Sequence, residues 1–242
     1  MTRLGVLLGL SLAAGLLGAG AGQAATMAKP ITNINKVTVK APVGPHTYTF
    51  TMTTFKITDT RSVHEDTDFA SVASAVGTAS AVPGPTKSMG NLNNGTYTAN
   101  ISVTASALPT DSVSFTYGII NSGYDANKLE TNLKKAIESA AEKAAKAGLA
   151  AAANTALPGS GAIASSIGSA GTDWFIGKLL DIVFANCDGS VAGGNHVFSG
   201  SQLAAQTAGG KTISGTDDNK GTDSATGCGA NSRYYVSWTI KG

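Results

Sequence analysis

The stretch Thr47-Tyr48-Thr49-Phe50-Thr51-Met52 decides the fold class, because aromatic or apolar residues alternate with threonine along it. A period of two residues is typical of a β-strand with one buried face and one face in water. The Thr53-Thr54 doublet breaks the alternation, and Phe55 and Ile57 resume it one residue late. This phase change predicts a β-bulge within a single strand.

The same alternation returns three times along the chain, and turn-forming residues lie between the runs. The runs are Tyr97-Ala99-Ile101-Val103, Val113-Phe115-Tyr117-Ile119 and Tyr234-Val236-Trp238-Ile240. The turn signals are Pro42 to Pro45, Pro83-Gly84-Pro85, Asn93-Asn94-Gly95 and Pro109-Thr110-Asp111. Short alternating strands with such punctuation predict an antiparallel β-sandwich. Residues 61–87 are expected to form a long loop or a poor edge strand, and residues 186–229 a loop-like, glycine-rich excursion.

The middle of the chain changes to a helical period. Apolar residues recur every three to four positions from 125 to about 154, at Leu129, Leu133, Ile137, Ala140, Ala144 and Ala147. A second helical run is expected from 162 to 186 and is strongly apolar from Trp174 to Phe184. The predicted fold is therefore mainly β, an antiparallel β-sandwich with an inserted α-helical hairpin at about 125–186.

The second helix of this hairpin carries Phe175, Leu179 and Val183 on a wide apolar surface. It needs a partner, which is either the alanine face of the first helix together with one side of the sheet, or a membrane or another protein. Lys178 and Asp181 near its middle count against a stable membrane span.

Composition and the chain start restrict the class of protein. The chain has 242 residues, a net charge of +2 and 13% charged residues, which excludes a basic nucleic-acid binder. Arg3 followed by the apolar run from Leu4 to Leu17 predicts a removed signal peptide over residues 1–24. Residues 25–242 would then form a single secreted or periplasmic β domain. In an oxidising compartment Cys187 and Cys228 are expected to form a disulfide.

The first candidate chemical site is the sequence His64-Glu65-Asp66-Thr67-Asp68. On an extended strand His64, Asp66 and Asp68 point to the same face, where they could bind a divalent cation or form an acid/base pair. A solvated loop or strand face is the alternative.

The second candidate is a calcium site. Asp217, Asn219 and Asp223 offer hard oxygen ligands around Gly221. The spacing departs from the twelve-residue calcium loop, so a metal-free Asx turn is the alternative. No other cofactor is indicated.

A third candidate is Tyr235, which should lie on the opposite strand face from Tyr234 and Trp238 and could stack on a sugar or contact a partner. His196 stands alone in the sequence and is interpreted as a surface residue or a structurally satisfied one.

These patterns favour a secreted, non-catalytic binding protein whose ligand is an extracellular protein or glycan, with no nucleic-acid partner. One alternative is a membrane-active toxin that deploys the helical hairpin. The other is a hydrolase built on His64, Asp66 and Asp68. The familiar catalytic motifs are absent from the sequence, which favours the non-enzymatic interpretations.

Overall fold

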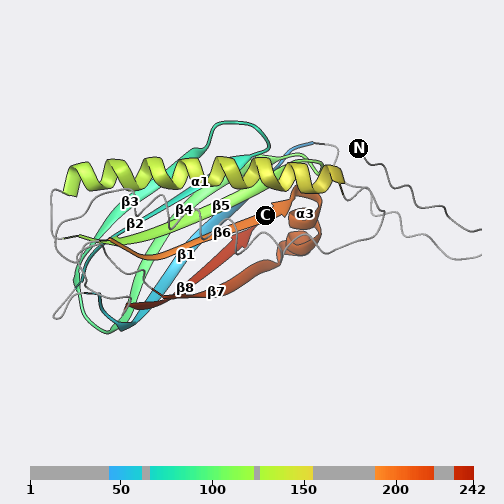
Figure 1. Ribbon diagram of the computed structural model, residues 1–242. Coiled ribbons are helices and arrows are strands. Elements are labelled where there is room, and N and C mark those ends of the chain that lie inside the picture. Colours follow the sequence, from blue (N-terminus) through green and yellow to red (C-terminus); the bar gives the residue numbers. More distant parts are fainter. Residues whose placement is uncertain (1–43, 62–65, 123–125, 155–188, 221–231) are drawn as a thin grey trace, which may run out of the picture. The chain divides into compact units, whose positions relative to one another are not determined.

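The computed structural model describes residues 44–61, 66–122, 126–154, 189–220 and 232–242, all within one compact unit (Figure 1). The strands are β1 (His46–Asp59), β2 (Asp66–Val76), β3 (Val82–Leu92), β4 (Gly95–Ala107), β5 (Ser112–Asn121), β6 (Gly189–Ser199), β7 (Thr212–Lys220) and β8 (Arg233–Lys241). The helices are α1 (Ala126–Asn154) and α3 (Gly200–Thr207), and a short 3-10 turn, Ala208–Gly210, follows α3. The strands form two four-stranded antiparallel sheets, ordered β4-β1-β8-β7 and β3-β2-β5-β6. The mainly β prediction is confirmed.

The predicted bulge in β1 is confirmed. The register of β1 shifts between Met52 and Thr54 against both of its neighbours, β4 and β8. The extra residue keeps the apolar side chains on the inner face before and after the shift. Those residues, Tyr48, Phe50, Met52, Phe55 and Ile57, are at most 1% exposed.

The two sheets face each other across an aromatic core. The rings of Phe50 on β1 and Phe115 on β5 stack with centroids 5.5 Å apart, and Trp238 on β8 lies 6.0 Å from Phe50. These residues come from three of the predicted strands. Their burial on the inner face follows from the alternation, because every second residue of a strand points to the same side.

Helix α1 covers the outer face of the β3-β2-β5-β6 sheet, as Figure 1 shows. Its buried residues Leu133, Ile137, Ala140, Ala141 and Ala145 pack against Phe69, Ala73, Ala75 and Ile120 of β2 and β5. The alanine face that was expected to receive a second helix thus lies on the sheet. As a result every residue of β5 is buried, because both faces of the strand are covered.

The expectation of a loop or poor edge strand over residues 61–87 is wrong for β2, which is an inner strand between β3 and β5. Residues 82–87 do lie in an edge strand, β3, which contains the Pro83-Gly84-Pro85 sequence predicted to be a turn. β2 shows no clear alternation because helix and core cover its two faces, so both call for apolar or small residues. Proline is tolerated in β3 because this strand lies at the edge of its sheet.

The expectation of a loop over residues 186–229 is also wrong where the structure describes it. Edge strands β6 and β7 occupy most of 189–220, joined by α3. The Ser199 side chain accepts from the backbone N–H of Gln202, whose side chain accepts in turn from the N–H of Ser199, a capping box that begins α3.

Several predictions lie outside the described residues. These are the signal peptide at 1–24, the second hairpin helix with Phe175, Leu179 and Val183, and both Cys187 and Cys228. The first helix of the hairpin is present as α1, and the complete hairpin stays a prediction. Neither helix in the described ranges is long and apolar enough to span a membrane.

Candidate functional site

Asp66 and Asp68 form a fully buried polar cluster between the sheets. They alternate on β2, so both point inward toward Tyr234 on β8. The Tyr234 hydroxyl lies 2.7 Å from Asp66 Oδ2 and 2.9 Å from Asp68 Oδ2. Both carboxyl groups are completely shielded from solvent. The two aspartates converge on Tyr234, and neither lies on a solvated face, because the inner face of β2 is the core side.

The two carboxyl groups have different surroundings. Asp66 accepts hydrogen bonds from the backbone N–H of Arg61 at 2.7 Å and from Asn121 Nδ2 at 2.9 Å, which stabilises the carboxylate. Burial, with the charge of Asp66 added, raises the pKa of Asp68 well above its ordinary value. A protonated Asp68 can donate to Tyr234 while Tyr234 donates to Asp66. The cluster therefore fastens the two sheets. His64 lies outside the described residues, and its part in a catalytic site stays a prediction.

A second polar cluster joins β7 to the opposite sheet at the β6 edge. Asp217 Oδ2 accepts from the Tyr117 hydroxyl at 2.7 Å and lies 3.0 Å from His196 Nε2. Asn219 accepts from the backbone N–H of Gly193 at 3.1 Å and donates to the Tyr117 hydroxyl, also at 3.1 Å. The alternation of β7 brings Asp217 and Asn219 inward together, so both sheets contribute to the cluster.

The electrostatics of this cluster keep Asp217 ionised. Burial opposes its ionisation, but the hydrogen bond and charge of His196, followed by the Tyr117 hydroxyl, hold the Asp217 pKa below its ordinary value. Burial, together with the Asp217 charge, raises the pKa of Tyr117 well above its usual range. The Tyr117 phenol therefore remains a donor to a carboxylate.

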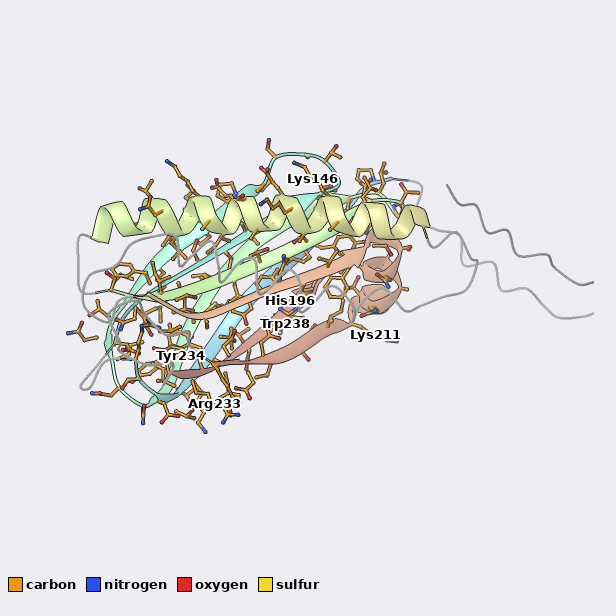
Figure 2. The ribbon with its side chains drawn as sticks, in the orientation of Figure 1. Lys146, His196, Lys211, Arg233, Tyr234 and Trp238 are labelled. Carbon is orange, nitrogen blue, oxygen red and sulfur yellow. The ribbon has the colours of Figure 1, made fainter. Side chains whose placement is uncertain are left out.

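The His196 ring occupies a defined slot beside Trp238, with centroids 4.1 Å apart (Figure 2). Its side chain is 15% exposed and that of Asp217 is 29% exposed, so the pair lies just beneath the surface. The sequence does not predict the contact between His196 and Asp217, because the two residues lie on different strands. The one indication in the sequence is the spacing of Asp217 and Asn219, which places both on the same face of a strand.

Glycines make room for the aromatic rings at this edge. Gly194 is the cross-strand neighbour of Tyr117, and a side-chain carbon at Gly194 would overlap the tyrosine ring. Gly215 stands in the same relation to Trp238. An aromatic ring lying across a glycine on a neighbouring strand restores the packing that the glycine lacks. This explains why such glycine-rich segments form strands.

The calcium hypothesis for Asp217, Asn219 and Asp223 finds no support in this arrangement. The inward oxygens of Asp217 and Asn219 already accept hydrogen bonds, and Asp223 lies outside the described residues. Within the described part of the chain, no group of three or more His, Cys, Asp or Glu side chains could hold a metal ion.

The outer side of the β4-β1-β8-β7 sheet presents a surface of a different kind, here named the hydroxyl face. In-register rows of serine and threonine cross its four strands. Two of the rows are Ser102-Thr51-Thr239-Ser214 and Thr98-Thr54-Ser237-Thr216. These side chains are exposed or half-buried. The hydroxyl face lies on the opposite side of the sandwich from α1.

Tyr235 lies on the hydroxyl face, opposite in phase to buried Tyr234 and Trp238, as its alternation predicts. The guanidinium carbon of Arg233 lies 5.2 Å from the centre of its ring. Asp218 holds Arg233 by two hydrogen bonds, 3.0 Å from Nε and 2.7 Å from Nη2. Lys56 is the cross-strand neighbour of Tyr235 on the other side. Tyr235 therefore lies next to two cations at one end of the hydroxyl face, and Asp218 is its neighbour on β7.

Comparison of the chain with protein-family models, curated proteins and solved structures finds no match.

Proposed function

We propose that this is a secreted, non-catalytic binding protein and that the hydroxyl face binds an extracellular glycan. The hydroxyl face carries the proposal. Each serine or threonine hydroxyl both donates and accepts hydrogen bonds, and so does each hydroxyl of a sugar. The aromatic ring of Tyr235 adds a large apolar surface, suited to the C–H face of a sugar ring.

The inner clusters support binding over catalysis. Asp66 and Asp68 are buried. The Asp217 carboxylate accepts a hydrogen bond from Tyr117 and contacts His196. Their contacts fix the two sheets to each other, which gives the hydroxyl face a rigid base. A rigid surface loses little conformational entropy when a ligand binds. The predicted signal peptide at 1–24 is the basis for expecting the protein outside the cell.

The test is an array of neutral and acidic glycans probed with the secreted protein. Thr51→Glu places a charge in the centre of the hydroxyl face, and Tyr235→Ala removes its aromatic ring. We expect each to weaken binding at least about tenfold, equivalent to about 1.4 kcal/mol. Lys146→Ala on α1 is the matched control, since Lys146 is exposed on the other side of the sandwich (Figure 2).

Binding that the two substitutions on the hydroxyl face leave unchanged would place the site elsewhere. No binding of any glycan by the wild-type protein would overturn the proposed function. Circular dichroism of each variant shows whether the fold is retained.

A further inference from the structure

We infer that the end of the hydroxyl face around Tyr235 selects acidic sugars, those that carry a carboxylate, over neutral ones. This inference rests on the proposed function and adds the class of ligand. Its basis is a pair of cations next to Tyr235, namely Arg233, whose guanidinium lies over the tyrosine ring, and Lys56, the neighbour of Tyr235 on β1.

Arg233 is a preorganised donor. Asp218 engages its Nε and Nη2, which fixes the plane of the guanidinium beside the Tyr235 ring. Among the described residues Nη1 has no acceptor, so its two N–H groups are available to a ligand. The hydrogen bonds and charge of Asp218 raise the pKa of Arg233, and the guanidinium stays charged. Holding such a side chain in place reduces the entropy lost on binding.

Lys56 supplies the second charge. Its side chain is exposed and forms no hydrogen bond or ion pair with any described residue. Directly opposed residues on neighbouring antiparallel strands have Cβ atoms about 4.5–5.5 Å apart. The Lys56 ammonium can thus reach a group bound over the Tyr235 ring.

The local charge balance favours an anion. Lys220 is the cross-strand neighbour of Arg233 and adds a third cation. The nearby carboxylates are Asp218, bound to Arg233, and Asp59, the partner of Arg233 on β1. Among the described residues, cations therefore outnumber carboxylates at this end. A sugar carboxylate placed between Arg233 and Lys56 would contact both while its ring lies on Tyr235.

The ligands for the test are an oligosaccharide of a uronic acid and its carboxyl-reduced neutral counterpart, which differ only in the carboxylate. Isothermal titration measures both affinities at low and high salt. We expect the wild-type protein to prefer the acidic form at least about tenfold at low salt, equivalent to about 1.4 kcal/mol. The preference should shrink at high salt, because exposed charges are screened.

Arg233→Gln and Lys56→Gln should each reduce this preference several-fold. Lys241→Gln is the matched control, since Lys241 is an exposed cation at the other end of the same strand face. Its preference should equal that of the wild type.

Equal wild-type affinity for the two ligands would overturn the selection for acidic sugars and leave the proposed function standing. The selection would also be overturned if Lys241→Gln lost as much of the preference for the acidic ligand as Arg233→Gln. The preference would then depend on the overall positive charge and not on the cations beside Tyr235. If the wild-type protein binds neither oligosaccharide and no glycan on the array, both the selection for acidic sugars and the proposed function are overturned.

Discussion

The two sheets of this protein differ in how many of their faces are covered, and this difference explains the burial patterns of their strands. In β4 the residues from Ala99 to Ala107 alternate between buried and exposed, because one side faces the core and the other is the hydroxyl face. In β5 every residue is buried, since α1 covers the second side. The burial pattern of a strand with one solvent-exposed face has a period of two, and that of a strand covered on both faces does not, although β5 keeps the alternation in its sequence.

The largest expected effect comes from placing a charge under α1. Ile120 on β5 is fully buried against the helix. Ile120→Asp would bury an unpaired carboxylate, and we expect a loss of about 4 kcal/mol or more in the free energy of unfolding. Urea denaturation measures it.

The matched change on the other sheet is Thr104→Asp, where Thr104 is exposed on the hydroxyl face. Its cost should stay within about 1 kcal/mol, the range of strand propensity. Equal costs at the two positions would contradict the difference in coverage between the sheets.

The two inter-sheet clusters should respond to pH in opposite directions. Asp217 has a lowered pKa in the folded state, so its contribution to stability is present above the unfolded carboxyl pKa and is lost as pH falls through the folded value. Asp217→Asn should cost about 1.5–3 kcal/mol at neutral pH, because hydrogen bonds to a charged group are lost. The cost should shrink on acidification, as measured by denaturation at several pH values.

Asp68 should behave in the reverse way. Its folded pKa is raised, so the folded state holds a proton that the unfolded state releases, and stability falls as pH rises from the unfolded pKa toward the folded one. Asp68→Asn should remove this decline. A parallel pH dependence for Asp68→Asn and Asp217→Asn would show that the two clusters have been assigned the wrong charge states.

The two edge strands β6 and β7 should be equally sensitive to loss of their glycines. Gly194→Ala and Gly215→Ala each push a methyl group into an aromatic ring, of Tyr117 and of Trp238 respectively. We expect each to lower the melting temperature, at a cost of about 1–3 kcal/mol. Gly44→Ala is the control, since a side-chain carbon there meets no atom within 4 Å. A neutral Gly194→Ala would contradict the close approach of β6 to Tyr117.

The smallest effect is expected on the outer surface of α1. Lys146 and Glu142 form an i,i+4 pair at 3.9 Å with the lysine side chain 51% exposed. Lys146→Ala should cost only about 0.2–0.5 kcal/mol. Thermal melts at low and high salt measure it, and a cost above 1 kcal/mol would show that Lys146 has a further role.

The sequence by itself predicted four strands from their alternating apolar residues, namely β1, β4, β5 and β8. It also predicted the bulge in β1 and the helix over 126–154. It also indicated that Asp66 and Asp68 share a strand face and that Tyr235 faces away from Tyr234. Each of these follows from local geometry, because side chains alternate along a strand and recur every three to four residues along a helix.

Only the tertiary structure decided the rest. β2 was missed because helix and core cover its two faces, and β6 and β7 because their glycines are compensated by Tyr117 and Trp238 on neighbouring strands. The pairing of His196 with Asp217 likewise joins strands from different sheets. Such contacts depend on which segments become neighbours, and the local period of a sequence carries no information about a partner that is distant along the chain.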